Sequence, residues 1–577
     1  MHGMPAPTTK PFMYHTSLPF SISALLIVLS AASSSLISSE ATTAETPAQN
    51  EARMAPWRAA RFGMFIHWGP ISLKGTEIGW SRGNQVPIEV YDNLYKEFNP
   101  VKFDAAAWVA VAKAAGMKYV VLTTKHHDGF CLWDTKQTDY KIMNSPFKRD
   151  VTKELAEACR KQGLGFGAYY STCDWHHPGF PVTSPGGTVK REKSDLEAYT
   201  AYLKAQTTEL VKNYGPLFTV WFDVPQCFDT ARGQGVINHL RAIQPNLVIN
   251  NRTGARGDYD TPEQRIGGFQ MQRPWETCMT ICQQWAWKPN DAMKPLDTCV
   301  RTLLQTIGGD GNLLFNVGPT PEGEIEPRQV ERLQEMGAWV AKHAASIYDT
   351  RGGPFLSGEW GVSTRAGKRI TLFVMHWPQD GRLRLPPIPA RILSAATITG
   401  EAVEIASADG LPVIVAPPPE RRDPIATAIV LELDSPAIAL TPVSLPMEAG
   451  NLCLGRPAKA SNVYNGMETY DAAKAVDSDV NSRWATDESH AAAWLEVDLG
   501  AEQRVSRIVI IESDFERVSR FAVQVQEGGA WRDIAGGTTI GQHREIVLPA
   551  PVTGRIFRLD VRESSDAPTI NEFQLFR

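Results

Sequence analysis

The sequence predicts a parallel α/β barrel, a (β/α)8-like fold, followed by two smaller units built from β-strands. Two observations predict the barrel: short apolar runs alternate with segments of helical periodicity, and the apolar runs end abruptly in polar side chains. From about residue 348 the pattern changes to short strands separated by Gly and Pro, which predicts the all-β part. At 577 residues the chain is expected to be multidomain.

Apolar runs that are continuous rather than alternating are typical of strands buried on both faces. Five such runs span residues 62–68, 118–128, 165–171, 216–223 and 247–252. Segments of helical period lie between them, at 103–116, 150–163, 192–214 and 235–243. A further run at 311–319 and a helix at 329–346 complete a barrel domain predicted over residues 53–347. Strand and helix alternating at these lengths imply βαβ units.

Polar and ionisable side chains stand at the ends of the predicted strands. Asp223 closes its run, His67 closes another, and His126 with His127 closes a third. A single terminal Asp could equally cap the helix that follows. Five strand ends carrying His, Tyr, Asp and Arg instead predict one polar pocket at the rim where barrel enzymes build their active sites.

The amino terminus resembles a secretory signal peptide, predicted over residues 1–35. Lys10 precedes an apolar run at 18–29, which is followed by small residues and is too short for a confident membrane span. Residues 36–52 are predicted to be a disordered linker. We expect an exported protein, periplasmic or extracellular, with no membrane span. The net charge of -5 does not suggest a nucleic-acid partner.

The second part of the chain is predicted to hold a small antiparallel β-sandwich at 348–441 and another all-β unit at 451–577. Asp477, Asp479 and Asn481 offer hard oxygen ligands at alternating positions, which suits either a structural calcium ion or an Asx turn. The eight cysteines form no compact disulfide framework, so we interpret them as buried thiols. Cys278 and Cys282 would lie one turn apart on a helix, but a second pair for metal binding is missing.

Several motifs in the first part resemble the retaining α-L-fucosidases of glycoside hydrolase family 29. The matching stretches are RFGMFIHWGP at 61–70, KHHDGF at 125–130, WFD at 221–223, NNR at 250–252 and NLLFNVGP at 312–319. Residues 451–577 resemble a discoidin, or coagulation factor 5/8 type C, module. The resemblance implies a jellyroll that often binds carbohydrate and holds calcium near Asp477.

Retaining hydrolysis needs two carboxyl groups, one as nucleophile and one as acid/base. The resemblance implies that Asp223 is the nucleophile. Glu263 and Glu276 are both candidates for the acid/base. Pro262 favours an extended loop that would project Glu263 over a pocket, whereas burial beside Trp275 would raise the pKa of Glu276. We favour Glu263 and keep Glu276 as the alternative.

The resemblance also implies a fucose-binding set. Its members are His67, Glu77, Trp80, His126, His127, Tyr170 and Arg252, and Trp275 is a further candidate. Three histidines could instead bind a metal, but adjacent histidines on an extended strand point to opposite sides, and the family needs no metal or other cofactor for chemistry. The usual Glu-Trp-Tyr stretch is replaced here by Glu77-Ile-Gly-Trp80. The Gly-Trp-Ser-Arg form at 79–82 and the Thr-Pro-Glu loop at 261–263 resemble the branch that prefers α-1,3/1,4-linked fucose.

The sequence thus predicts an exo-acting retaining α-L-fucosidase that removes terminal fucose from oligosaccharides or glycoconjugates. Two alternatives stay open. A related pocket could accept another sugar, such as an α-galactoside. The chain could also be a non-catalytic glycan-binding protein, although Asp223 and both acid/base candidates are present.

Overall fold

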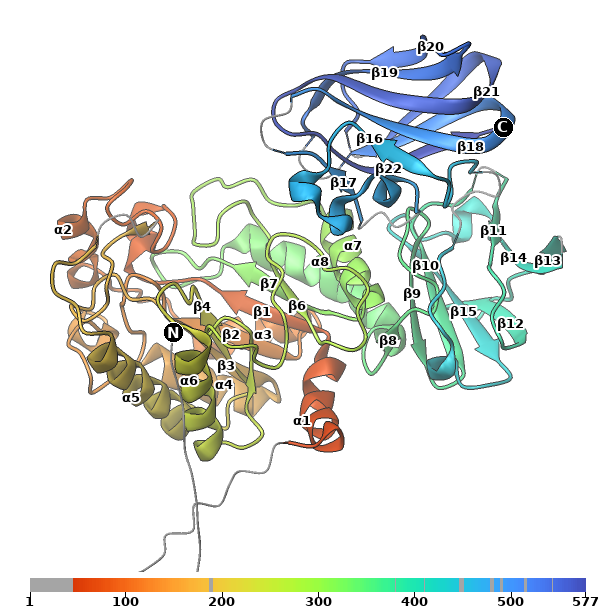
Figure 1. Ribbon diagram of the computed structural model, residues 1–577. Coiled ribbons are helices and arrows are strands. Elements are labelled where there is room, and N and C mark those ends of the chain that lie inside the picture. Colours follow the sequence, from red (N-terminus) through yellow and green to blue (C-terminus); the bar gives the residue numbers. More distant parts are fainter. Residues whose placement is uncertain are drawn as a thin grey trace, which may run out of the picture. The chain divides into compact units, whose positions relative to one another are not determined.

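The computed structural model describes residues 45–577, apart from short gaps at 186–189, 379, 409, 446–450, 478–481, 488–490, 513–515 and 542. Three domains follow one another along the chain (Figure 1). The predicted signal peptide at 1–35 lies outside the described residues. Of the helices in the described part, none has the length and apolar character needed to cross a membrane.

The first domain is built on a parallel sheet, as predicted. Its strands are β1 (Phe62–Ile66), β2 (Tyr119–Lys125), β3 (Gly165–Ser171), β4 (Thr219–Asp223), β5 (Val248–Ile249), β6 (Glu276–Thr280) and β7 (Asn312–Val317). Their spatial order is β5-β4-β3-β2-β1-β7-β6, and every neighbouring pair is parallel. β1, β2 and β7 are buried along their whole length, which explains why their sequences are continuous apolar runs.

An irregular extended segment, residues 258–264, takes the place of an eighth strand between β5 and β6. The amide of Asp258 donates to the carbonyl of Ile249 in β5 (2.7 Å). On the other side, the amides of Glu276 and Cys278 in β6 donate to the carbonyls of Asp260 (2.9 Å) and Pro262 (3.1 Å). This segment closes the barrel and carries Glu263 to its rim.

Helices cover the outside of the strands (Figure 1). They are α3 (Ala105–Ala114), α4 (Val151–Gln162), α5 (Leu196–Tyr214), α6 (Thr230–Ile243), α7 (Leu296–Gly308) and α8 (Pro327–His343). The first four of these begin after an aspartate whose carboxylate accepts backbone amides of the first turn, at Asp104, Asp150, Asp195 and Asp229. Such caps locate helix starts that periodicity alone leaves open.

The predicted linker at 36–52 is wrong in its last residues, because helix α1 (Pro47–Ala60) already begins at Pro47. Its first turns are polar and exposed, so composition gave no sign of a helix. Met54, Trp57 and Ala60 lie on one face and pack into the interior of the barrel, which stabilises the helix through tertiary contacts. The side-chain Nδ2 of Asn312, at the start of β7, donates to the carbonyl of Trp57 (2.7 Å).

The second domain is an antiparallel sandwich. One sheet contains β8 (Arg351–Gly352), β9 (Gly361–Ala366), β10 (Arg369–Val374), β12 (Ile392–Thr397) and β15 (Thr427–Leu433), and the other contains β11 (Arg382–Arg384), β13 (Ile405–Ala408) and β14 (Leu411–Val415). Leu372, Ile414 and Leu431 belong to its buried core.

The third domain is also antiparallel. Its strands are β16 (Ala458–Ala460), β17 (Trp484–Ala485), β18 (Ala493–Glu512), β19 (Val518–Glu527), β20 (Ala530–Gly537), β21 (Arg544–Ser564) and β22 (Thr569–Phe576). Trp484 is fully buried in the core of this domain. The carboxylate of Asp477 accepts the hydroxyl of Ser482 (2.9 Å), whereas Asp479 and Asn481 lie outside the described residues.

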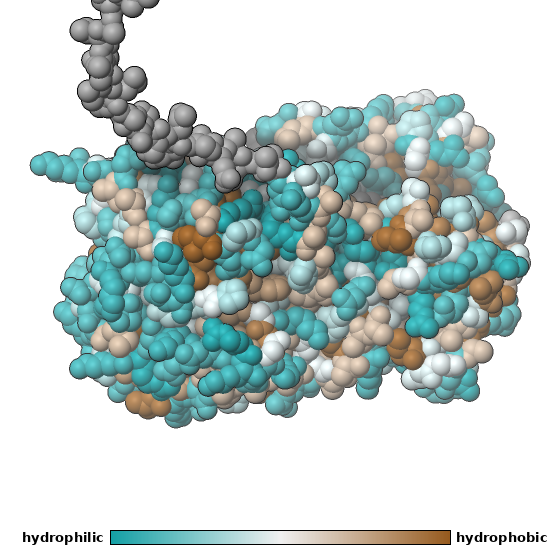
Figure 2. Space-filling view, turned by 90° about the horizontal axis from the view of Figure 1, so that it is seen from below, coloured by the Kyte–Doolittle hydropathy of each residue, from teal (hydrophilic) through white to brown (hydrophobic). Residues whose placement is uncertain are grey.

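Hydrophilic side chains cover most of the face shown in Figure 2, and hydrophobic ones form only small, separate patches on it. Single exposed apolar residues of this kind are normal on globular proteins.

Candidate active site

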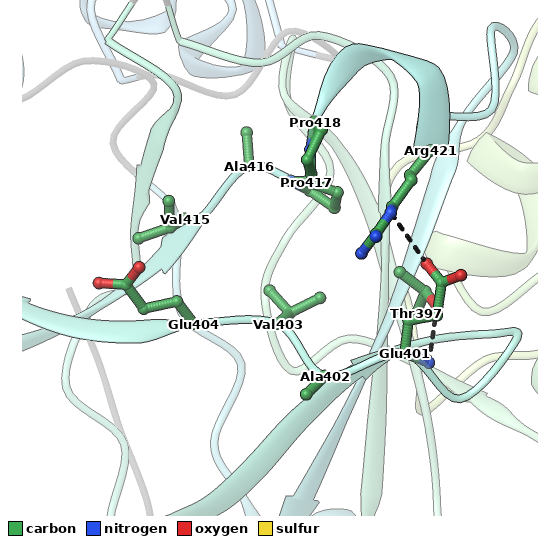
Figure 3. Close-up of a pocket in the computed structure, with 10 residues that line it drawn as sticks. All are labelled: Thr397, Glu401, Ala402, Val403, Glu404, Val415, Ala416, Pro417, Pro418 and Arg421. Carbon is green, nitrogen blue, oxygen red and sulfur yellow. Dashed lines mark hydrogen bonds and ion pairs between the residues drawn. The ribbon is translucent and has the colours of Figure 1, made fainter.

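Two cavities are prominent in the described part of the chain. The first, about 200 Å³, lies in the sandwich domain beside β12 and β14. Figure 3 shows that the carboxylate of Glu401 lies beside Arg421 (3.8 Å), while Glu404 points away from this pair. No two carboxylates converge in this cavity, so hydrolysis by a carboxylate pair is not expected there.

The second cavity lies at the carboxyl-terminal rim of the barrel, where the sequence predicted a polar pocket. It brings together six of the predicted residues: His67, Trp80, His126, Asp223, Arg252 and Glu263. The other lining residues were not in the predicted set: Phe65, Tyr169, Trp221, Val224, Cys278 and Trp285.

Arg252 bridges the two carboxylates of the cavity. Its Nη1 donates to Asp223 Oδ1 (2.8 Å) and to Glu263 Oε2 (2.8 Å). The two oxygens are therefore at most about 5.6 Å apart, twice 2.8 Å. The guanidinium is fixed by Thr261, whose Oγ1 and carbonyl accept from Nε (2.7 Å) and Nη2 (2.8 Å), and it lies over the ring of Trp221. Arg252 therefore fixes the positions of the two carboxylates relative to each other.

Asp223 is held ionised at the end of β4. Burial alone would raise its pKa, but the charge of Arg252 and hydrogen bonds from Arg252 and Tyr169 lower the pKa below the usual value. Val224, the next residue, has a φ of 46°, a left-handed conformation that is strained for a β-branched side chain. Its amide donates to Asp223 Oδ1 (2.9 Å). Strain of this kind persists where the surroundings fix a functional group.

Two histidines are fixed in one tautomer by their partners. Asn316 donates its Nδ2 to the carbonyl of Trp285 (2.7 Å), so its Oδ1 accepts from Nδ1 of His67 (2.6 Å). Ser171 donates its hydroxyl to the carbonyl of Cys173 (2.7 Å), so its oxygen accepts from Nδ1 of His127 (2.7 Å). In both neutral rings Nε2 is then left as an acceptor. Burial lowers the pKa of His67 to about 3 and that of His127 to about 4, so both rings are neutral at pH 7.

His126 and His127 do not point to opposite sides, contrary to expectation. β2 ends at Lys125, after an irregularity in its pairing with β3, and the two rings lie 3.9 Å apart. Nε2 of His127 is 3.7 Å from Asp223 Oδ2, although His127 does not line the cavity. Among the described residues, no group of three His, Cys, Asp or Glu side chains has the arrangement of a metal site.

The expectation for Tyr170 is wrong, and Tyr169 takes its place. Tyr169 donates its hydroxyl to Asp223 Oδ2 (2.9 Å), whereas Tyr170 points outward and donates to Gln206 on α5 (2.7 Å). The register of β3 and β4 pairs Tyr169 with Trp221, two residues before Asp223. Residues two apart on a strand share a face, so alternation counted back from Asp223 identifies Trp221 and its partner Tyr169. The same counting from His67 identifies Phe65.

Glu276 and Trp275 do not lie at a strand end over the pocket, because they stand where β6 begins. Glu276 is fully buried inside the barrel, where Trp221 Nε1 donates to its Oε1 (2.9 Å) and the hydroxyl of Tyr119 donates to its Oε2. Burial raises its pKa to about 7. The indole of Trp275 donates to the carbonyl of Gly309 (3.1 Å), and the residue does not line the cavity.

Glu77 does not line the cavity either. Its carboxylate accepts the backbone amides of Trp285 (2.9 Å) and Ala286 (3.0 Å), in the loop after β6. Trp285 itself does line the cavity, and no sequence motif marked it, because it lies in a loop without periodicity. Cys278 lies in β6, so it is not one helical turn from Cys282. All eight cysteines are free thiols, and seven of them are buried.

Comparison with known proteins identifies the family of this barrel. The family model described as alpha-L-fucosidase matches residues 29–345, more than half of the 577 residues. The chain belongs to the alpha-L-fucosidase family. A model described as F5/8 type C domain matches residues 457–573, which places the third domain in the discoidin group. The family resemblance and the barrel, sandwich and discoidin architecture predicted from the sequence are confirmed.

Individual members of the family extend over most of the chain. The plasma alpha-L-fucosidase of Homo sapiens is 31% identical over 392 residues, which cover 60% of this chain and 82% of that protein. A solved alpha-L-fucosidase from Bacteroides thetaiotaomicron, trapped as a covalent intermediate, is 26% identical with a TM-score of 0.60, covering 67% of this chain and 96% of its own. A solved alpha-L-fucosidase from Vibrio sp. strain EJY3 has the same fold over 92% of this chain and 98% of its own, with a TM-score of 0.65 and 22% identity.

Proposed function

We propose that this fucosidase is exported and exo-acting, and that it releases terminal fucose from glycans by double displacement with retention. The observation that carries the proposal is the pair of carboxylates that share Nη1 of Arg252, with oxygens at most about 5.6 Å apart. Retaining glycosidases place their two carboxyl groups about 5 to 5.5 Å apart, whereas inverting ones need about 6.5 to 9.5 Å. The covalent intermediate trapped in the Bacteroides thetaiotaomicron relative supports the same route.

In this proposal Asp223 is the nucleophile. It is ionised and oriented by Arg252 and Tyr169, so it can attack the anomeric carbon of fucose. Glu263 gives a proton to the departing oxygen of the aglycone. In the second step, Glu263 takes a proton from a water molecule, the water attacks the fucosyl-enzyme, and the Asp223 carboxylate is released. Glu263 is 42% exposed, so its carboxyl group is open to both the aglycone and the water.

The remaining lining residues suit a 6-deoxy sugar. His67 and Arg252 offer an acceptor and donors to hydroxyl groups, and His126 and Trp80 lie beside them. Phe65 and Trp285 form an apolar wall that suits a methyl group, which favours fucose over a galactoside with its hydroxymethyl group. The catalytic steps use no cofactor. A structural calcium ion near Asp477 in the discoidin domain, and glycan binding by that domain, belong to the same proposal.

The test is release of fucose by the mature chain from nitrophenyl α-L-fucoside and from a branched Lewis-type trisaccharide, with the anomer identified by NMR. We expect α-fucose as the first product. Turnover of the trisaccharide alone would place the enzyme in the α-1,3/1,4 branch, and turnover of both would define a broad fucosidase. Release of β-fucose would exclude retention. Hydrolysis of nitrophenyl α-galactoside alone, or binding of glycans without hydrolysis, would replace the proposal by one of the two alternatives.

A further inference from the structure

Glu77 does not line the cavity, but its carboxylate binds the backbone amide of Trp285, which does. Its Oε1 accepts from the amides of Ile78 (3.1 Å) and Ala286 (3.0 Å), and its Oε2 accepts from the amide of Trp285 (2.9 Å). Burial raises its pKa. A buried carboxylate is stable only when hydrogen bonds compensate for lost water, and here backbone amides of two separate loops supply them.

The loop that Glu77 holds is fixed from other sides as well. Asn316, at the end of β7, donates to the carbonyl of Trp285 (2.7 Å). Asp291 Oδ2 accepts the amides of Gln283 (3.1 Å) and Gln284 (2.9 Å). Both backbone groups of Trp285 are therefore bound, its amide by Glu77 and its carbonyl by Asn316. These two hydrogen bonds fix the backbone from which the Trp285 side chain reaches the cavity.

Trp285 in turn shapes the cavity. Its ring lies 4.8 Å from the ring of His67 and 6.1 Å from that of Phe65, and all three residues line the cavity. Asn316 also accepts from Nδ1 of His67, so one amide side chain connects the histidine and the tryptophan. A shift of the loop would move the tryptophan wall and disturb the histidine at the same time.

We propose that Glu77 is a positioning residue that holds Trp285 against His67, and that it does not bind the sugar itself. This inference refines the proposed function, because it assigns the apolar side of the sugar site to the Glu77–Trp285 contact. Ile78 and Gly79 separate Glu77 from Trp80, of which only Trp80 lines the cavity. Gly79 has a φ of 67° and lies so close to His126 that a Cβ would come within 2.7 Å of its Nδ1. The chain thus turns sharply between the glutamate and the tryptophan of this stretch.

The first test observes Trp285 directly and requires no activity. The whole chain is labelled with 5-fluorotryptophan, and Trp285→Phe assigns the fluorine resonance of Trp285. We expect this resonance to shift or broaden in Glu77→Ala, and to do so less in Glu77→Gln, which keeps one acceptor oxygen. Glu89→Gln, an exposed glutamate on α2 (Ile88–Tyr91), is the matched control. An unchanged Trp285 resonance in folded Glu77→Ala would overturn the inference. If Glu77→Ala does not fold, the same criterion applies to Glu77→Gln.

The second test is a double-mutant cycle on fucoside hydrolysis. If Glu77 acts through Trp285, Glu77→Gln should lower kcat/KM about tenfold in the wild-type background and less than about twofold in Trp285→Ala. We expect the loss mainly in KM, because a wall contact is made by bound substrate and transition state alike. Equal losses in both backgrounds would mean that Glu77 contacts the sugar directly. If the wild type is inactive but the Trp285 resonance shifts in Glu77→Ala, the proposed function is refuted and the positioning role remains.

Discussion

At the carboxyl-terminal rim of the barrel, Asp223 and Glu263 share the Arg252 guanidinium, whereas Glu276, at the amino end of β6, is bound by the hydroxyl of Tyr119 and the indole of Trp221. The surroundings of Asp223 and Glu276 shift the pKa values of these two carboxyl groups in opposite directions. Arg252 lowers the pKa of Asp223, and burial raises the pKa of Glu276 to about 7. A pKa near 7 suits a general acid, and a raised pKa is what made Glu276 a candidate acid/base from the sequence. The comparison shows that burial deep enough to raise a pKa can also remove the group from the cavity.

The largest expected effect is at the rim. Asp223→Asn keeps the shape of the side chain but removes the proposed nucleophile, so kcat for fucoside hydrolysis should fall by at least about 10⁴-fold. Glycan binding, measured by calorimetry with a non-hydrolysed fucoside analogue, should persist. Loss of binding together with activity would mean that Asp223 has a structural role.

The variants Glu263→Gln and Glu276→Gln compare the two acid/base candidates directly. We expect Glu263→Gln to lower kcat by about 10² to 10⁴-fold on the trisaccharide, and less on nitrophenyl fucoside, whose leaving group needs little proton donation. Glu276→Gln should stay within about tenfold of wild type on both substrates. The reverse order of the two variants would transfer the acid/base role to Glu276.

Glu276, the carboxylate inside the barrel, should instead make the free energy of unfolding depend on pH. The pKa of Glu276 is raised to about 7 from 4.5, so its stabilising proton is fully bound below about pH 4.5 and is lost as pH rises through about 7. Since a pKa difference of one corresponds to about 1.4 kcal/mol, wild type should lose up to about 3 kcal/mol of unfolding free energy across this range relative to Glu276→Gln. Urea unfolding of both proteins at pH 4.5, 6 and 8 measures it. Equal pH dependences of the unfolding free energy in the two proteins would show that ionisation of Glu276 does not destabilise the fold.

The smallest expected effect concerns the tautomer of His127. Ser171→Ala removes the acceptor of its Nδ1–H, and the ring is then free to turn or to carry its proton on Nε2, facing Asp223. We expect kcat/KM to fall roughly tenfold, which corresponds to about 1.4 kcal/mol. Ser171→Thr, which keeps the hydroxyl, should restore most of the activity. Equal losses in both variants would indicate a packing defect.

Much of this site was predictable from the sequence, and the exceptions have physical causes. Strand ends pointed to His67, Asp223 and Arg252, which line one cavity because the carboxyl ends of parallel strands share one rim. Tyr169 was recoverable from strand alternation, but a choice between adjacent tyrosines needs the register. Glu276 stayed open as a candidate because the sequence does not show at which residue a short strand such as β6 begins. Trp285 depends on contacts with Glu77 and Asn316, which come from distant parts of the chain.

Covalent labelling tests directly whether Asp223 is the nucleophile. The wild-type chain is inactivated with 2-fluoro-fucosyl fluoride, the compound found with the Bacteroides thetaiotaomicron relative, and its peptides are mapped by mass spectrometry. We predict one fluorofucosyl group on Asp223, which persists longer in Glu263→Gln than in Glu276→Gln, because Glu263 activates the water that would release it, whereas the fluoride leaving group needs little proton donation. A label on Glu263 or Glu276, or an unlabelled protein that still releases fucose, would contradict this prediction.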